Sequence, residues 1–307
     1  MATLKGQNFR IGTVTSDSEG TYFKVFGMAT SCSVTRNTQT DDASTKDDVG
    51  LSSKPTVLSK SCQIQVESLN VTDMAAMLTA IKSMTPLTLM WDETSTTDNQ
   101  TVLQADCSRK GQFFLNDCQF QFDDRTNAVK NLQFVSTGPI STTQSGDITT
   151  TVLSAGSYTK GQFVRLFLSS DNTNTPVKVI AAAKQLSFHV SVQMESATTK
   201  DTEGDYEVQE PVGITFDISS NALMRSSDTI TSSVEAQDFA SIEDIYDAGT
   251  PVKFQIVNVS GANQRTKGTV IVSGSAIINQ LDANSANRQS VEYKTSMTGY
   301  GDFTVGS

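Results

Sequence analysis

Apolar and polar residues alternate with a period of two along several segments of the chain. The alternation is clearest over residues 186–193, and it recurs over 32–35, 62–67 and 214–219. This period is typical of a β-strand with one buried and one solvated face. Each segment is therefore predicted to be a half-buried strand. The polar positions of these strands form a first candidate surface: Ser33, Thr35, Gln63, Gln65, Glu67, Ser187, Ser191, Thr215 and Asp217.

Two other segments have helical spacing. Apolar residues at 74, 77, 78, 81 and 84 fall on one stripe of a helix, as do those at 239, 242, 245 and 246. Thr72 is expected to cap the first helix and Pro86 to end it, whereas Gly249 and Pro251 end the second. Both stripes are predicted to pack against a core.

One 28-residue segment occurs twice. Residues 23–50 and 177–204 align without a gap at an offset of 154 and are identical at ten positions, where about two are expected by chance. Lys-Gly-Gln at 5–7 recurs at 160–162, and Lys-Gly at 110–111 recurs at 267–268, which aligns 113–120 with 270–277. The chain is therefore predicted to hold two domains, 1–140 and 158–307, joined by a Thr-, Ser- and Gly-rich linker at 141–157.

Each copy continues into a long polar segment, at 38–50 and 196–205, which fits either a flexible loop or an extended hairpin. Thr-Lys-Asp is identical in the two segments, which favours a shared contact role over a neutral connector. Their charged residues form a second candidate surface: Asp41, Asp42, Lys46, Asp47, Asp48, Lys200, Asp201 and Glu203.

Composition narrows the class of protein. The 307 residues are 37% hydrophobic, which suits thin β-layers with one wet face, and the net charge is −10. An acidic chain does not grip nucleic acid, because such binding needs Lys and Arg to neutralise phosphates, although plain solubility also explains the charge. There is no apolar leader and no run approaching the roughly 18 residues that span a bilayer, so neither secretion nor membrane insertion is expected.

Chemistry-bearing residues are few. His189 is the one histidine, so a catalytic triad or histidine metal site has little to build on. The aspartates at 41, 42, 47 and 48 lack the ligand spacing of a calcium loop, and adjacent Asp and Glu at 92 and 93 would point to opposite faces of a strand. Cys32, Cys62, Cys107 and Cys118 are interpreted as small buried hydrophobes. We expect no cofactor, no metal and no enzymatic activity.

The order of the motifs resembles the major tail tube proteins of long-tailed bacteriophages. The motifs are the leading Lys-Gly segment, Ala-Thr-Ser-Cys at 29–32, Ser-Thr-Lys-Asp at 44–47, one helix, and Ser-Thr-Gly-Pro-Ile at 136–140, with Ser-Met-Thr-Gly at 296–299 closing the second copy. The resemblance implies a mainly β fold of two tandem tail-tube-like sandwich or barrel domains, each with one flanking α-helix and a long polar loop. In this family six such domains form a ring, and stacked rings form the tail tube through which DNA is ejected.

Two domains per chain imply that three chains complete a ring, as a homotrimeric, pseudo-hexameric assembly. The implied partners are further copies of the chain, other tail proteins at the tube ends, and DNA that passes without specific binding. The implied location is the virion tail, assembled in the bacterial host cytoplasm. On this interpretation the first candidate surface lines the lumen and the second contacts a neighbouring ring; a merely solvated sheet face remains the alternative for the first.

Other roles remain open. A tail terminator or a capsid decoration protein would share many of these features. A carbohydrate-binding adhesin would need exposed aromatic residues, and Trp91 is the one tryptophan.

Overall fold

The computed structural model describes residues 6–44, 53–69, 71, 73–94, 108–143, 148, 150–153, 158–202, 204–224, 236–260 and 266–306. The chain is mainly β with two α-helices, as the sequence predicts. Among the described residues, neither helix has the length and apolarity needed to cross a membrane.

In the first half of the chain, the described residues form a short 3-10 helix, nine strands and one α-helix. Their bounds are η1 Gly6–Asn8, β1 Phe9–Asp17, β2 Gly20–Val25, β3 Ala29–Asp42, β4 Pro55–Ser68, α1 Met74–Ser83, β5 Leu87–Glu93, β6 Arg109–Asp123, β7 Val129–Ser136, β8 Ser141–Thr142 and β9 Thr150–Leu153. The second half has η2 Gly161–Phe163, β10 Val164–Leu168, β11 Lys178–Ile180, β12 Ala183–Ser196, β13 Gln209–Leu223, β14 Ala236–Gln237, α2 Phe239–Ala248, β15 Val252–Ser260, β16 Thr266–Asn284, β17 Glu292–Gly299 and β18 Thr304–Val305.

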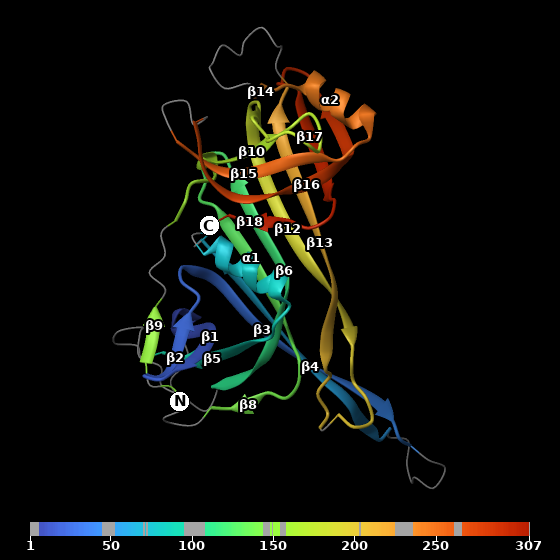
Figure 1. Ribbon diagram of the computed structural model, residues 1–307. Helices are drawn as coiled ribbons and strands as arrows, with labels where there is room; N and C mark the ends of the chain where they lie inside the picture. The colour runs from blue at the N-terminus through green and yellow to red at the C-terminus, as the bar shows by residue number, and fades with distance from the viewer. Residues whose placement is uncertain are drawn as a thin grey trace.

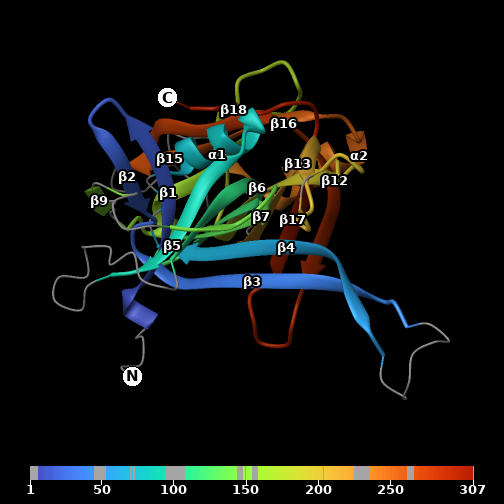
Figure 2. The ribbon, with the colours of Figure 1, turned by 90° about the horizontal axis from the view of Figure 1, so that it is seen from below.

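Eight strands from both halves form one continuous antiparallel sheet (Figures 1 and 2). Their order is β3-β4-β7-β6-β12-β13-β17-β16. The halves meet where β6 pairs with β12, from Asp117 opposite Ser191 to Asp123 opposite Gln185. The sheet therefore crosses from one half to the other without a break in its backbone hydrogen bonding.

A second layer covers the apolar face of this sheet in each half. β5, β1, β2 and β9 follow from β6 in the first half, and β15, β10, β11 and β14 follow from β16 in the second. Phe26 stacks on Phe134 across the first core, with ring centroids 5.7 Å apart. In the second, Phe216 contacts Phe254 and Phe303 at centroid distances of 5.8 and 5.3 Å. One buried apolar cluster joins both halves, because β6 and β12 are neighbours.

The helices follow the predicted spacing with three corrections. Thr72 lies outside the described residues, and Asp73 occupies the N-cap of α1 without a side-chain capping bond. Met84 is not part of the helical stripe but its left-handed C-cap, at φ 49°. In α2, Ile242 and Ile245 are buried and Gly249 caps the end, whereas Tyr246 is 41% exposed and lies outside the buried stripe.

The two halves have matching strand registers. The β3–β4 pair has irregularities after Ala29 and Gln39, and the β12–β13 pair has them after Ala183 and Gln193, at the same offset of 154 as the sequence repeat. β6 and β16 also match, but at an offset of 163, because their irregularities with β7 and β17 follow Leu115 and Ile278.

This register corrects the sequence alignment of the later strands. Gly111 lies opposite Leu89 and Gly274 lies opposite Phe254, so Gly274 rather than Gly268 corresponds to Gly111. The predicted alignment of 113–120 with 270–277 is therefore wrong by six positions. Residues 282–284 belong to β16, so the turn that follows this strand lies at 285–290.

Residues 141–157, predicted as a linker, contain two short strands. β8 pairs with β6, from Arg109 opposite Thr142, and β9 pairs in parallel with β2, from Tyr22 opposite Thr150. The pairing of β18 with β16 repeats that of β8 with β6 at the offset of 163.

Candidate assembly surfaces

The first candidate surface lies on one face of the continuous sheet. Cross-strand pairs place Ser33, Gln65, Gln133, Asp117, Ser191 and Thr215 in a single row over six strands. A parallel row contains Glu67, Asn131, Gln119, His189, Asp217 and Thr298. Directly paired residues share a face, so all nine predicted positions lie together, with Thr35 opposite Gln63 and Ser187 next to His189. None of the nine is buried.

Sequence reasoning missed the middle of this face. Gln133 and Asn131 of β7 and Asp117 and Gln119 of β6 join the predicted positions of the two halves. The sequence of β6 does alternate here: the polar Asp117 and Gln119 are interleaved with the apolar Cys118 and Phe120, which are buried. What the sequence did not contain was the pairing of β6 with β12, which joins two segments that lie far apart along the chain.

A histidine–carboxylate pair lies at this junction. His189 Nε2 is 2.7 Å from Asp117 Oδ2, and the Gln119 amide donates to Ser187 Oγ at 3.2 Å. The hydrogen bond to Asp117, aided by the charge of Asp217, raises the pKa of His189 against the opposing effect of partial burial. Polar side chains thus join the two halves on the same face as the predicted surface.

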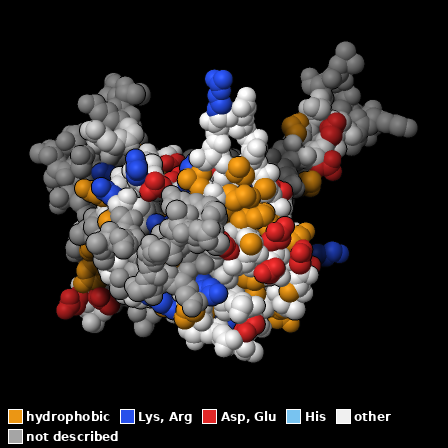
Figure 3. Space-filling model, turned by 90° about the horizontal axis from the view of Figure 1, so that it is seen from above, with side chains coloured by type: hydrophobic (Ala, Val, Ile, Leu, Met, Phe, Trp, Pro, Cys, Tyr) orange, Lys and Arg blue, Asp and Glu red, His pale blue; other side chains and the backbone are white. Residues whose placement is uncertain are grey.

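The polar face carries more acidic than basic side chains. Its rows contain Glu67, Asp117 and Asp217, and in the outer strands Asp282 lies opposite Lys294. A hollow of about 320 Å³ lies on it between β3, β4, β6 and β7. On the end of the molecule seen in Figure 3, the coloured Lys and Arg side chains are scattered rather than gathered in one patch. The described residues contain no group of three or more His, Cys, Asp or Glu that could hold a metal ion.

The polar segments after the alternating strands are extended hairpin arms. β3 and β4 remain paired to Asp42 opposite Pro55, and β12 and β13 to Ser196 opposite Gln209 (Figures 1 and 2). Asp41 and Asp42 are exposed near the end of the first arm, and Lys200 and Asp201 at the tip of the second. Lys46, Asp47, Asp48 and Glu203 lie outside the described residues. Of the two structures that the sequence left open, the hairpin is the one observed.

Asp42 has a local structural role. Its carboxylate accepts hydrogen bonds from the backbone and hydroxyl of Ser44 and from the Lys54 amide, at 3.0 Å from Ser44 N and 3.2 Å from Lys54 N. The Ser44 hydroxyl and then its backbone amide hold the pKa of this carboxyl below its ordinary value. Asp42 thus links the two strands of the arm near the last of their described residues.

The second arm is fastened to the first within the chain. Lys60 Nζ is 2.7 Å from Asp205 Oδ2, Arg36 donates to the Tyr206 hydroxyl at 2.9 Å, and Ser59 donates to Glu207 at 2.9 Å. Backbone bonds join Lys60 to Asp205 and Glu207 as well. The sequence contained no signal for this arm contact, because each of its residues appears as an ordinary polar residue.

Each outer edge of the continuous sheet is the counterpart of a strand at the junction in its middle. β3 corresponds to β12, and β16 corresponds to β6. Among the described residues, β3 pairs only with β4, and residues 277–284 of β16 pair only with β17. Cys32 and Val34 on β3 are half-buried, whereas their β12 counterparts Leu186 and Phe188 are at most 3% exposed. Ala283 of β16 is exposed, whereas its counterpart Phe120 is fully buried. Each outer edge therefore lacks the strand that covers its counterpart.

Two of the four cysteines, Cys62 and Cys118, fit their predicted interpretation as small buried hydrophobes, whereas Cys32 is only half-buried. Cys62 and Cys118 are buried, and burial raises the pKa of the Cys62 thiol to about 11, which makes it a poor nucleophile at neutral pH. Cys107 lies outside the described residues.

Comparison with known proteins gives structural matches only. No family model and no curated protein matches the chain. A chain from the tail of an empty gene transfer agent particle, solved with C6 symmetry, matches 47% of this chain and 95% of its own, at 15% identity and a TM-score of 0.34. A chain of the native gene transfer agent virion matches 48% of this chain over 99% of its own length, at 16% identity and a TM-score of 0.35. The SPP1 tail tube protein matches 48% and 78%, at 19% identity and a TM-score of 0.37. Each of the three matches covers about half of this chain.

Proposed function

We propose that this protein is the structural subunit of a tail tube, and that three copies close into a ring through the edges of their continuous sheets. The observation that carries the proposal is the β6–β12 junction together with the unpaired edges of β16 and β3. The matching registers support a duplicated tube domain. An interface between duplicated units joins unlike edges, so it repeats head to tail until the rotation closes.

The register of the interface between chains follows from the one within the chain. Replacing β6 by its counterpart β16, and β12 by its counterpart β3, turns the pair Phe120–Phe188 into Ala283 of one chain opposite Val34 of the next. The pair Gln119–His189 becomes Asp282 opposite Thr35. Both free edges would then gain backbone partners and cover their half-exposed apolar side chains.

Ring closure defines a channel of suitable size. Three chains supply the six tube domains of a ring in the family that the sequence resembles, and eight strands each make a barrel of 24 strands. With strands about 4.8 Å apart and tilted by about 40°, opposite backbones lie on the order of 50 Å apart. Such a barrel leaves a channel wide enough for duplex DNA once side chains are subtracted.

The chemistry of the polar face suits passage of DNA. The apolar face of the sheet is covered by the second layer, so the polar rows would line the channel. Phosphate-neutralising Lys and Arg side chains would hold DNA in the tube, whereas the carboxylates Glu67, Asp117 and Asp217 repel it. The exposed ends of the arms, with Asp41, Asp42, Lys200 and Asp201, would contact the neighbouring ring, and their mixed charges suit register more than affinity.

A substitution on the free edge of β16 tests this proposal. Ala283→Asp adds a charge at an exposed position of the single chain, so its fold should be unaffected, but in the ring the charge would be buried against Val34. We expect stacked rings of uniform width in negative-stain micrographs of the unaltered protein, and none for the variant. Asn284→Asp, on the opposite face of the strand, is the matched control and should assemble.

Two results separate the remaining possibilities. Monomers of the unaltered protein at high concentration would contradict assembly. Single rings that do not stack would favour a terminator at the end of a tube.

A further inference from the structure

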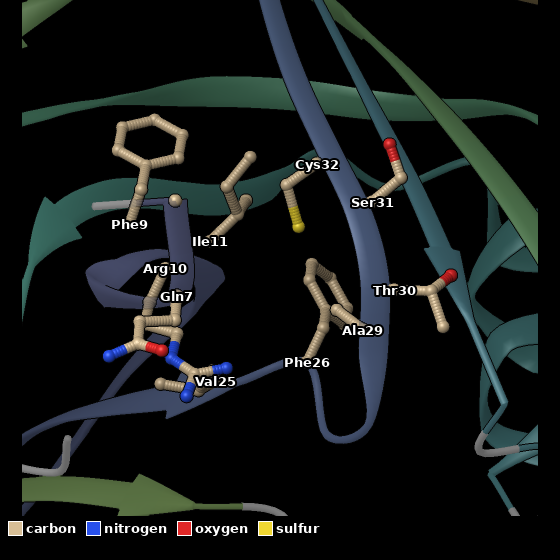
Figure 4. Close-up of a pocket in the computed structure, with 11 residues that line it drawn as sticks. Gln7, Phe9, Arg10, Ile11, Val25, Phe26, Ala29, Thr30, Ser31 and Cys32 are labelled. Carbon is tan, nitrogen blue, oxygen red and sulfur yellow. The ribbon is translucent and has the colours of Figure 1, made fainter.

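Each half of the chain has a cavity at the same place, beside its first strand (β1 or β10) and the start of its long strand (β3 or β12). In the first half it measures about 560 Å³ and is lined by Gly6, Gln7, Arg10, Ser31 and Cys32, among others (Figure 4). In the second half the corresponding cavity measures about 20 Å³, with Gly161, Gln162, Arg165, Gln185 and Leu186 in its wall. The pronounced difference in volume has a cause within the chain.

The turn between β6 and β7 fills the second cavity. The Gly161 amide donates to Thr126 O at 2.9 Å, the Asp124 amide donates to Lys184 O at 2.8 Å, and the Ala128 amide to Thr159 O at 2.7 Å. The turn lies so close that a Cβ on Gly161 would stand 2.3 Å from Asp123 O. Glycine is required at 161 because the backbone of the neighbouring half passes there.

Gly6, the counterpart of Gly161, has no such neighbour. It is exposed, and a Cβ placed on it meets nothing within 4 Å among the described residues, whereas Gly161 is buried. Its φ also lies outside the left-handed region that favours glycine. The described part of the single chain therefore gives no reason for the glycine of the first Lys-Gly-Gln motif.

The second half carries a turn with the same shape as the one that fills the small cavity. Arg125 has φ 61°, and Arg288, its counterpart at the offset between β6 and β16, has φ 63°. The Thr126 amide lies 3.5 Å from Asp123 O in the first turn, and the Gln289 amide 3.1 Å from Ala286 O in the second. Residues 285–290 are exposed and follow directly on the free edge of β16.

We propose that the cavity around Gly6 and Cys32 is a socket for residues 285–290 of a second copy of this chain. This inference rests on the proposed ring. The turn in the socket would be the contact at the end of the interface between β16 of one chain and β3 of the next. Ala286 O would approach Gly6 as Asp123 O approaches Gly161, and Ser285 would lie opposite Cys32 as Phe122 lies opposite Leu186. The glycine of each Lys-Gly-Gln motif then has one purpose, which is to admit the turn of the preceding domain.

A disulfide between chains tests the geometry. Directly opposite residues in antiparallel strands have Cα atoms about 4.5–5.5 Å apart, within the range that a disulfide spans. Ser285→Cys, assembled and then oxidised, should therefore form a bond to the native Cys32 of the next chain. We expect a covalent trimer, with dimers as intermediates, on a non-reducing gel. Adding Cys32→Ser is the matched control and should remove every linked species.

Filling the socket is the second test. Gly6→Leu should leave the melting temperature of the unassembled chain within a degree or two of the unaltered protein, because the site is open, and it should abolish rings. Unimpaired rings in this variant would overturn the socket.

The outcomes separate this inference from the proposed function. Rings that form without a Cys32-dependent link overturn the socket and leave the ring standing. If the unaltered protein forms no rings, both fail.

Discussion

Gly161 and Gly6 allow a direct comparison of an occupied and an open site in one chain. Gly161→Ala places a methyl group 2.3 Å from Asp123 O, 2.5 Å from Asp123 N and 2.8 Å from Phe122 C. All three atoms belong to the backbone, so no side chain can rotate away. The turn at 122–128 must move by about 1 Å to restore ordinary contact, which starts at 3.4 Å. Gly6→Ala places the same methyl group in open space.

The expected cost has two parts. Overpacking of a tight contact costs about 1–3 kcal/mol. The displacement also weakens the Gly161–Thr126 and Ala128–Thr159 hydrogen bonds, each with a net contribution of about 1 kcal/mol. We therefore expect Gly161→Ala to lower the free energy of unfolding by about 3 kcal/mol, which for a chain of this length lowers Tm by about 5 °C. Gly6→Ala should change it by less than about 0.5 kcal/mol.

Urea and thermal unfolding of both variants, below the concentration at which the chain assembles, measure this difference. Ring formation should distinguish the variants in a second way. Gly6→Ala should leave the single chain as stable as the unaltered protein but impair ring closure, whereas Gly161→Ala should destabilise the single chain itself. Equal stability of the two variants would refute the account of the junction, because the turn would then not lie against Gly161.

Three further predictions concern the junction, the first core and the arms. Asp117 stabilises the protonated form of His189, so the pair's contribution to folding stability is complete below the unfolded pKa of about 6.5 and is lost as pH rises through the higher folded pKa. NMR titration of this histidine should give a pKa above 6.5, and a lower pKa would contradict the pairing. The Lys130 side chain is fully buried against Asp73 at 2.5 Å, so Asp73→Asn should cost about 3 kcal/mol in urea unfolding and Lys130→Met distinctly less, whereas equal losses would show that the ion pair is not the cause. Asp205→Ala removes an exposed ion pair and should change stability by less than about 1 kcal/mol, but hydrogen exchange at 205–207 should quicken, and unchanged exchange would mean that backbone bonds alone hold the arm.

The sequence was sufficient for the local elements. Alternation over 186–193 and 62–67 predicted strands because one face of each packs on the core, and helical spacing found both helices. The nine polar positions share a face for the same reason. The two-residue period of a strand determines which of its side chains lie on one face, whichever strands it pairs with.

Non-local contacts were beyond the sequence. The pairing of Asp117 with His189 depends on which strand edges meet, and no residue pattern specifies that. Residues 36–42 are polar on both faces because the arm extends past the core, so backbone pairing rather than burial makes them a strand. The shift to Gly274 arose because the irregularities at Leu115 and Ile278 set the register, whereas the repeated Lys-Gly is a chance match.

Whether three chains form each ring through β16 and β3 can be decided by cryo-electron microscopy of the assembled protein. We expect three chains per ring and an unbroken inner barrel of 24 strands, with Ala283 of one chain opposite Val34 of the next and residues 285–290 in the socket beside Gly6. Six chains per ring, or an inner wall in which β16 and β3 remain unpaired, would contradict it.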